Sequence, residues 1–301
     1  WRHQLPAFAA LGFRAIAPDM RGYGRSTVYP KQSDYAQELI VRDMIELLDS
    51  TGRQRAVWIG HDWGSPVAWN VASHHPDRCE AVASLCVPYH TIEYGLDYTI
   101  TLVDRNLYPE NEFPAGQWEY MRHYEENFAD AIAPMDANVR KFLKLAFRKG
   151  NPEGEGQRAM TSMARKGGGL FGRTELPDVP VDTDVITEQD LSIYASALER
   201  NGFYGPSSWY SNHQTNAAYG AKAHNDGYLD MPALFIAARY DYVCESVHSR
   251  LGEPMRKYCR NLSEEVIRAG HWVAQEKPRE VNAALVKWLV TKVPQVWPRP
   301  A

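Results

Sequence analysis

Hydrophobic and polar positions along the first third of the chain predict strands and helices that follow one another in turn. Three short apolar runs have the length and composition of buried strands, at 14–19 (RAIAPD), 56–60 (AVWIG) and 81–87 (AVASLCV). Three other segments are typical of helices with one apolar side, at 4–11, 35–51 and 65–75. Strands that alternate with helices of these lengths predict a parallel sheet covered by helices.

A long middle segment, residues 88–226, does not continue this alternation. Aromatic, proline and charged residues are mixed there, and helical patches at 118–130, 137–149 and 187–201 are separated by breaks rich in glycine and proline. The earlier pattern then returns, with strands predicted at 232–239 and 264–269 and a closing helix at 278–290. We therefore predict an α/β core, formed by residues 1–87 and 227–301, with a helical insertion between its two parts.

The composition is that of a globular protein, and it excludes several classes of function. The chain has 301 residues, of which 44% are hydrophobic and 23% are charged. This length is enough for one large α/β domain with an insertion. A net charge of −4 gives no basic surface for nucleic acid. The apolar runs are too short and too interrupted to span a bilayer, so we expect no transmembrane segment.

Neither a C-x-x-C pair nor a Cys/His spacing typical of a metal site occurs among the four cysteines, Cys79, Cys86, Cys244 and Cys259. We interpret them as thiols of a reducing compartment, which favours a cytoplasmic location, although two disulfides are also compatible with the sequence. The first residue is Trp1 rather than Met, and no secretory segment follows. We therefore expect the native N-terminus and any targeting signal to lie outside this sequence.

Residues 60–65 (GHDWGS) have the pattern of a turn that displays a nucleophile between a strand and a helix. In this pattern, glycines on both sides of the nucleophile let the strand and the helix approach closely around a strained turn. Asp62 occupies the position of the nucleophile. The N-terminal end of the following helix would help to keep its carboxylate ionised. The other interpretation of Asp62 is an N-cap for that helix.

An aspartate at this position indicates a different electrophile from the one that a serine attacks. A serine alkoxide is suited to acyl carbons, whereas a carboxylate can displace a leaving group at a saturated carbon and form an alkyl ester. Water can then cleave this ester at its carbonyl carbon. Asp62 therefore predicts a substrate with an electrophilic sp3 carbon, either an epoxide or a compound with a carbon–halogen bond.

Cleavage of the ester requires an activated water molecule, and His271 and Asp241 are the candidates for this task. His271, in AGHW, follows the last predicted strand, where a loop reaches the carboxyl edge of the sheet. Asp241 comes directly after the strand at 232–239 and lies between Asp62 and His271 in chain order. We expect Asp241 to fix the tautomer of the imidazole and to stabilise the imidazolium.

Two alternatives stay open for the acid that orients the histidine. Asp241 could instead be an N-cap for the helix that follows it. Glu93 and Asp97, which come after the strand at 81–87, are the reserve candidates. His61, beside the nucleophile turn, is predicted to point away from the cleft.

Six stretches of the chain have counterparts in one known family. They are PDMRGYGRS at 18–26, GHDWGSPVAW at 60–69, AVASLCVP at 81–88, NGFYGPSSWY at 201–210, RYDYV at 239–243 and GHWVAQEKPREVN at 270–282. Together they resemble the epoxide hydrolases of the α/β-hydrolase superfamily, close to the hydrolase domain of the soluble mammalian and plant enzymes. The resemblance implies an α/β-hydrolase fold with a mostly parallel central sheet and a helical lid over 88–226, inserted between the core parts 1–87 and 227–301.

The resemblance also implies two lid tyrosines that hold the epoxide oxygen and protonate the departing alkoxide. The second matches Tyr210, in SSWYSN, and the first falls in WEYMRHYEENF, where we favour Tyr120 and keep Tyr124 in reserve. A phenol is a suitable acid because the ring-opened alkoxide is far more basic than a phenolate. Trp63 and Trp272 are predicted to contribute to the oxyanion and substrate-binding site, Trp63 through its backbone N–H.

One element of the family pattern, a His-Gly-x-Pro turn, does not occur in the sequence. It would precede WRHQLPAF at 1–8, and its loop supplies a backbone N–H to the oxyanion hole of the family. The N–H of Trp63 is then the one donor that the sequence identifies, and loss of one such donor costs about 2.7–4 kcal/mol in the transition state. We therefore expect this sequence to be incomplete and its sheet to have unpaired edges.

We predict an enzyme that opens small lipophilic epoxides with water to vicinal diols, through an alkyl ester on Asp62 and with no metal and no cofactor. The aromatic content of the lid favours an apolar pocket. One alternative is a haloalkane or haloacid dehalogenase with the same nucleophile, in which the N–H of Trp63 would hold the halide. Another is a non-catalytic ligand-binding protein of the same fold. A homodimer is also compatible with the sequence.

Overall fold

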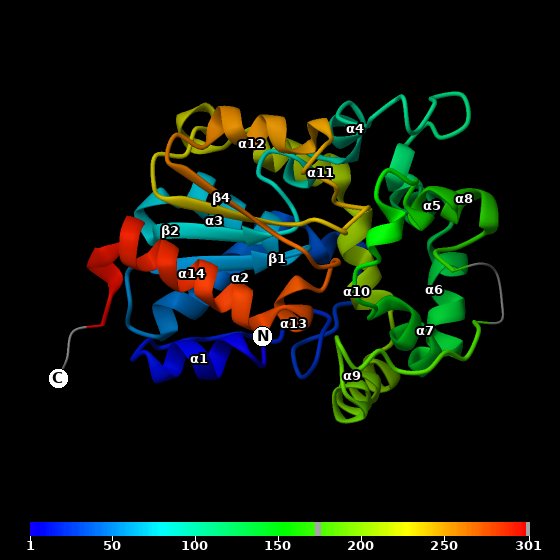
Figure 1. Cartoon of the computed structure of the whole chain (residues 1–301), viewed down its shortest axis with the longest axis horizontal. Helices are drawn as coiled ribbons and strands as arrows, with labels where there is room; N and C mark the ends of the chain where they lie inside the picture. The colour runs from blue at the N-terminus through cyan, green and yellow to red at the C-terminus, as the bar shows by residue number, and fades with distance from the viewer. Residues whose placement is uncertain (172–175, 299–301) are drawn as a thin grey trace.

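Four parallel strands form the single sheet of residues 1–171 and 176–298, which are the residues that the computed structural model describes (Figure 1). The strands are β1 (Ala56–His61), β2 (Cys79–Leu85), β3 (Ala233–Ala238) and β4 (Leu262–Ile267), and they lie in the order β1-β2-β3-β4. In the register, Gly60 pairs with Ser84, Ser84 with Phe235, and Phe235 with Glu264. Because every pair is parallel, the carboxyl ends of the strands meet at one edge of the sheet.

Helices cover both faces of the sheet, because successive residues of each strand point to opposite sides. The core helices are α1 (Gln4–Ala10), α2 (Gln37–Ser50), α3 (Gly64–His74), α12 (Glu253–Tyr258), α13 (Val273–Glu276) and α14 (Pro278–Lys292). On one face, Val82 and Phe235 form an apolar cluster with residues of α3 and α12. On the other face, Ala83 and Ile236 belong to the larger cluster that includes Leu285 of α14. The prediction of a parallel sheet between helices is confirmed.

The predicted strand at 14–19 is wrong. These residues have no regular secondary structure, Ile16 is 49% exposed, and no backbone-to-backbone hydrogen bond joins the segment to a strand. An apolar run forms a strand only when a neighbouring strand satisfies its N–H and C=O groups. None of the four strands of the described residues pairs with this segment, and the outer edge of β1 is also unpaired.

The middle of the chain folds into helices, and α5 to α9 lie to the right of the sheet in Figure 1. The helices are α4 (Leu96–Ile100), α5 (Glu119–Glu126), α6 (Phe128–Ala137), α7 (Val139–Ala146), α8 (Ala164–Gly167), α9 (Glu188–Asn201), α10 (Tyr204–Ser208) and α11 (His213–Gly220). The helical patches predicted from the sequence correspond to α5 with α6, to α7 and to α9. The described residues do not include 172–175, which belong to the predicted lid, or 299–301, which belong to the second core part.

Helix α9 shows how the local sequence sets the boundaries of a helix in the inserted segment and joins it to the core. A capping box starts it, because the Asp190 N–H donates to the Thr187 hydroxyl at 3.1 Å and the Thr187 N–H donates to the Asp190 carboxylate at 2.8 Å. Gly202, at φ 70, ends it. Near this end, Arg200 and Asn201 donate to the Gly24 carbonyl at 2.7 and 2.8 Å. The helix is therefore tied to the turn around Gly24.

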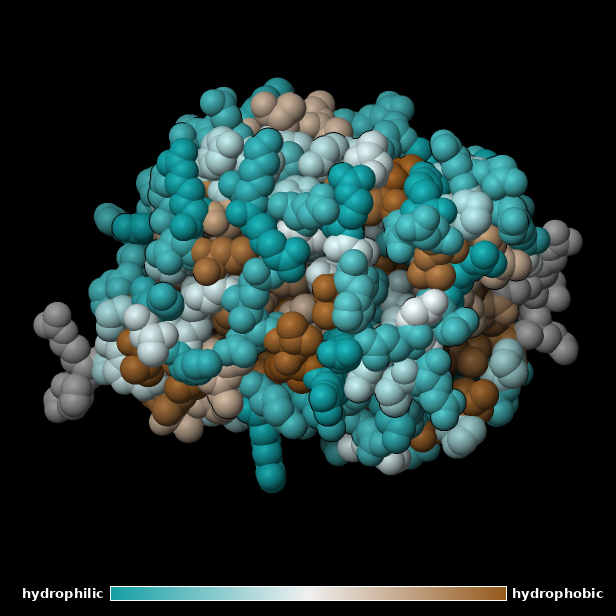
Figure 2. All heavy atoms as spheres, turned by 45° about the horizontal axis from the view of Figure 1, so that its top comes forward, coloured by the Kyte–Doolittle hydropathy of each residue, from teal (hydrophilic) through white to brown (hydrophobic). Residues whose placement is uncertain are grey.

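No helix in the part of the chain that the structure describes combines the length and the hydropathy that a membrane-spanning segment needs. On the face drawn in Figure 2, hydrophobic residues lie in separate patches among hydrophilic ones. The prediction of no transmembrane segment holds for these residues.

Candidate active site

A tight turn between β1 and α3 displays Asp62 at the carboxyl edge of the sheet. Asp62 has φ 50, in the left-handed region that non-glycine residues rarely adopt, and its carbonyl accepts the Ser65 N–H at 2.9 Å. Gly60 lies so close to the start of α3 that an added Cβ would be 2.2 Å from the Gly64 carbonyl oxygen. Glycine is therefore required at position 60 for the strand and the helix to meet in this turn.

Replacement of Gly60 by alanine tests this packing. The new methyl group would overlap with backbone that can move only if the start of α3 moves, so we expect Gly60→Ala to lose about 1–3 kcal/mol of unfolding free energy, or more. Gly64→Ala is the matched control, because an added Cβ there meets no atom within 4 Å. Its destabilisation should stay below about 0.5 kcal/mol. Equilibrium urea unfolding measures both values, and equal losses would contradict the packing argument.

His271 lies between Asp62 and Asp241 at this edge of the sheet. Asp241 follows β3 and His271 follows β4, so parallel pairing brings their loops to the turn that holds Asp62. His271 Nδ1 is 2.6 Å from one Asp241 oxygen, and His271 Nε2 is 3.6 Å from an Asp62 oxygen. The other Asp241 oxygen accepts the Cys244 N–H at 3.1 Å, which fixes the carboxylate. The structure thus brings together the three residues that the sequence predicts as a triad.

The charges of these three side chains stabilise one another. Burial alone would lower the pKa of His271, but the carboxylates of Asp241 and Asp62 outweigh it and hold this pKa well above its ordinary value. Burial would raise the pKa values of Asp62 and Asp241, but His271 holds both below their ordinary value. At neutral pH the resting site therefore holds an imidazolium between two carboxylates.

Two phenols, those of Tyr120 and Tyr210 of the inserted helical segment, line the same cavity as Asp62. Tyr120 belongs to α5 and Tyr210 to a short 3₁₀ helix (Trp209–Ser211), and their ring centres are 5.7 Å apart. Burial raises the pKa of both phenols well above the ordinary value. Both are therefore neutral hydrogen-bond donors at physiological pH.

The reserve tyrosine of the sequence analysis, Tyr124, has a different environment. Its ring stacks on Tyr210 with centres 4.9 Å apart, and its hydroxyl donates to the Met135 sulfur at 3.7 Å. Burial raises its pKa to about 12. Tyr124 also lines the cavity, but its hydroxyl is engaged by Met135, so Tyr120 remains the favoured partner of Tyr210.

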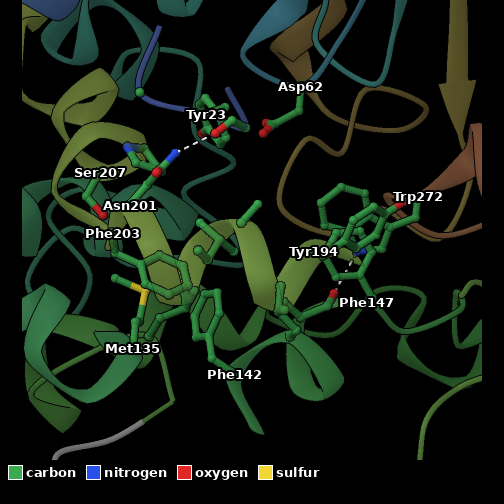
Figure 3. A pocket seen from close by; sticks show the side chains of 18 of the residues that line it. Tyr23, Asp62, Met135, Phe142, Phe147, Tyr194, Asn201, Phe203, Ser207 and Trp272 are labelled. Carbon is green, nitrogen blue, oxygen red and sulfur yellow. Dashed lines mark hydrogen bonds between the residues drawn. The ribbon is translucent and has the colours of Figure 1, made fainter. Parts of the chain in front are cut away.

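Asp62, His271 and the phenols border a cavity of about 1030 Å³, whereas Asp241 lies buried behind His271. Figure 3 shows Asp62 on one side of it and the apolar side chains of Met135, Phe142 and Phe203 away from the carboxylate. A cavity of this size accepts an organic molecule with tens of atoms, and its mostly apolar lining favours a lipophilic one.

Comparison with known proteins agrees with this geometry. Residues 1–278 match the model of the alpha/beta hydrolase fold family. Epoxide hydrolase A of Mycobacterium tuberculosis is 33% identical over 96% of this chain and 85% of its own length. The chain belongs to the epoxide hydrolase family of the α/β hydrolases. A solved structure, epoxide hydrolase A from Mycobacterium thermoresistibile, is 30% identical with a TM-score of 0.76 and covers 97% of this chain and 86% of the solved one.

Other relatives in this family are longer than the present sequence. Bifunctional epoxide hydrolase 2 of Sus scrofa is 33% identical over 97% of this chain, and that of Mus musculus is 34% identical over the same share. The chain spans about half the length of these two relatives, 49% and 50% respectively. The resemblance to the epoxide hydrolases that the sequence analysis states is confirmed at the level of family and fold.

Trp63 and Trp272, the two predicted tryptophans, differ in their relation to the cavity. The ring of Trp63 is buried against Trp209 and Tyr210, and it is not among the residues that line the cavity. The backbone N–H of Trp63 donates to Asp62 and helps to lower the pKa of that carboxyl. Trp272 lines the cavity, stacks on Phe147 with ring centres 4.0 Å apart, and donates its indole N–H to the Ala146 carbonyl at 2.6 Å.

Sequence reasoning missed Tyr23, a third phenol beside Asp62 (Figure 3). Gly22 and Gly24 flank it with φ of 87 and 54, and a Cβ on either would overlap with neighbouring atoms. A tyrosine between two such glycines is therefore presented by a tight turn. The glycine–tyrosine–glycine sequence is visible in the stretch at 18–26, but nothing in the sequence indicates that this turn faces Asp62.

The reserve acids and His61 lie outside the cavity lining. Glu93 is 1% exposed, accepts the His90 N–H, and has a pKa that burial raises to about 7. Asp97 forms an ion pair with Arg122 at the surface. His61 is predicted to point away from the cleft, and its Nε2–H donates to the His271 carbonyl at 2.7 Å. Burial lowers the pKa of His61 to about 4, so this imidazole is neutral and holds the backbone at His271.

Proposed function

We propose that this protein hydrolyses lipophilic epoxides to vicinal diols through a covalent ester on Asp62. One observation carries the proposal: the Asp62 carboxylate, 3.6 Å from His271 Nε2, borders the same cavity as the phenols of Tyr120 and Tyr210. A nucleophile, a base and two acids then border one apolar cavity, as a two-step opening of an epoxide requires.

In the first step, an Asp62 oxygen bonds to the less hindered epoxide carbon while the carbon–oxygen bond of the ring breaks. The released alkoxide takes a proton from Tyr120 or Tyr210, and the other phenol donates a hydrogen bond to the same oxygen. The turn at φ 50 aims the carboxylate into the cavity. The product of this step is a hydroxyalkyl ester of Asp62.

Ester formation also converts His271 into a base. The Asp62 charge is one of the two charges that hold the pKa of His271 high, and esterification removes it. The pKa of His271 then falls, and the proton that it releases can restore the phenolate to a phenol. Asp241 continues to orient the neutral imidazole through Nδ1.

In the second step, His271 takes a proton from water, and the hydroxide attacks the ester carbonyl carbon. The N–H of Trp63 donates to the oxyanion of the tetrahedral intermediate. Collapse of the intermediate breaks the bond between this carbon and the alkyl oxygen, and the departing diol takes the proton from His271. The Asp62 carboxylic acid then returns its proton to His271, which restores the resting charges.

We also propose residues 88–226 as the lid of this active site, between core parts 1–87 and 227–301. Side chains from α6, α7 and α9 line the cavity, so they would set the size and shape of the accepted epoxide. A cytoplasmic location and a homodimer stay predictions. All four cysteines are buried as free thiols, which supports the prediction of a reducing compartment.

A dehalogenase with the same nucleophile is the main alternative, and a non-catalytic binding protein is the other. The phenols of Tyr120 and Tyr210, which line the cavity, would have no task in halide release. We expect diol from an aryl or alkyl epoxide and no halide from the haloalkane of the same carbon skeleton. Halide release without diol would favour the dehalogenase, and tight binding without turnover would favour the binding protein.

The lid tyrosines give a prediction for the first step. Tyr210→Phe and Tyr120→Phe should each slow ester formation by about 10²-fold, and the double variant by about 10⁴-fold, because each phenol supplies an acid or a hydrogen bond to the alkoxide. Tyr124→Phe is the matched control, and it should stay within about threefold of the wild type. Stopped-flow measurement of tryptophan fluorescence in a single turnover reports the rate. Equal effects of all three substitutions would contradict the assigned roles.

A further inference from the structure

A cysteine thiol lies beside the two residues that are proposed to activate water. The Cys244 sulfur, an Asp241 oxygen and a His271 ring nitrogen all lie within 4.8 Å of one another. Cys244 follows Asp241 by three residues, and its backbone N–H donates to the Asp241 carboxylate at 3.1 Å. Cys244 and His271 both line the cavity, so a solute that enters the cavity reaches these two side chains.

Sulfur, imidazole nitrogen and carboxylate oxygen together form a donor set that thiophilic divalent cations prefer. Zinc binds such atoms at about 2.0–2.3 Å in a tetrahedral arrangement, which separates the ligand atoms by roughly 3.3–3.8 Å. The three atoms are within 4.8 Å before any cation is present. His271 Nδ1 and the nearer Asp241 oxygen are only 2.6 Å apart, so these two side chains must separate slightly, and Cys244 must rotate, to bind one cation. Water from the cavity can take the fourth position.

We propose that Asp241, Cys244 and His271 form an inhibitory site for a thiophilic divalent cation such as Zn²⁺ or Cd²⁺. The cation bonds to the Cys244 sulfur, to His271 Nδ1 and to an Asp241 oxygen. The thiol and Nδ1 each release a proton to solvent, and no atom is oxidised or reduced. A coordinated thiol is deprotonated by the cation itself.

Occupation of this site removes the base of the second step. Nδ1 then binds the cation, so Nε2 keeps the remaining ring proton and cannot accept one from water. Asp62 does not bind the cation, so its carboxylate can still attack the epoxide and form the ester. The cation-bound protein therefore forms the ester once and does not hydrolyse it. This consequence rests on the proposed function, whereas cation binding itself does not.

A second cluster offers an internal control. His61, Cys86 and His271 also bring three donor atoms within 4.8 Å. His61 and Cys86 do not line the cavity, and the Cys86 thiol donates to the His271 carbonyl at 3.3 Å. A cation that arrives through the cavity meets Cys244 first, so the two thiols distinguish the two sites.

Titration of the metal-free protein with Cd²⁺ alone tests the site without a substrate. Cadmium bound to a thiolate gives an ultraviolet charge-transfer band, and we expect one equivalent of it in the wild type and in Cys86→Ala. Cys244→Ala and Cys244→Ser should lose the band and bind Cd²⁺ more than about 100-fold more weakly. Thermal unfolding shows that each variant is folded. A wild type with no band, a band that survives in both Cys244 variants, or a band that is lost in Cys86→Ala would each overturn the proposal.

Activity gives the second readout. With Cd²⁺ bound, one epoxide equivalent should be consumed and the Asp62 peptide should carry the alkyl mass, while Cys244→Ser should keep turning over at the same Cd²⁺ concentration. Steady diol formation at saturating Cd²⁺ would overturn the inhibitory role. If the metal-free protein forms no diol, the proposed function fails, and the titration still decides whether the cation site exists.

Discussion

Asp62→Ala should abolish diol formation, with a loss of about 10⁴-fold or more in kcat. The substitution removes the atom that bonds to the epoxide carbon, and no other carboxylate can take its place, since Asp241 is held by His271 at 2.6 Å. Binding of the epoxide should weaken little, because the surface of the cavity is mostly apolar and most of its lining residues come from the inserted segment 88–226. Steady-state diol formation together with the Kd of a non-reactive ether analogue measures both effects.

Asp97→Ala is the matched control for this loss. Its side chain is 81% exposed and is bound to Arg122 at the surface, and it was a reserve candidate for the orienting acid. We expect kcat within about twofold of the wild type, because surface substitutions away from a site usually change stability by less than about 0.5 kcal/mol. If Asp62→Ala keeps full activity, or if Asp97→Ala loses as much, the nucleophile has been assigned to the wrong residue.

His271→Gln should separate the two steps of the reaction. The glutamine amide can still donate hydrogen bonds to the carboxylates, so ester formation should continue. The amide cannot accept a proton from water, so ester hydrolysis should slow by about 10⁴-fold. Mixing the variant with one equivalent of epoxide should leave most of the protein as the ester, which intact-mass measurement detects as an increase by the mass of the epoxide.

His248→Gln is the matched control, because it makes the same substitution at a histidine that does not line the cavity. His248 is 60% exposed and pairs with Glu155 at 3.1 Å, away from the cavity. This variant should turn over normally and accumulate no ester. If His271→Gln forms neither ester nor diol while it remains folded, His271 has a role in the first step that the proposal does not contain.

The sequence predicted the core of the site because its signals are local. Asp62 sits in a turn that Gly60 and Gly64 define within five residues, and Asp241 and His271 each follow a strand that composition alone identifies. Parallel pairing of those strands then brings three distant positions to one edge. The helices of the lid were predicted for a similar reason, since Thr187 and Gly202 mark the ends of α9 within its own sequence.

What the sequence could not predict depends on neighbours that are distant in the chain. Residues 14–19 have the composition of a strand, yet no described strand pairs with them, and so the segment has no regular structure. Tyr23 reaches the cavity because Arg200 and Asn201 of the lid hold the next residue, Gly24. The proposed role of Cys244 in cation binding depends on Asp241 and His271, which the fold places beside it.

A single turnover in water labelled with oxygen-18 tests the central claim most directly. The protein is mixed with less than one equivalent of epoxide, and the Asp62 peptide and the diol are then analysed by mass spectrometry. Attack of water on the ester carbonyl predicts label in the Asp62 carboxylate and none in the diol. Label in the diol with an unlabelled Asp62 peptide would mean that water attacks the epoxide directly, and would contradict the ester mechanism.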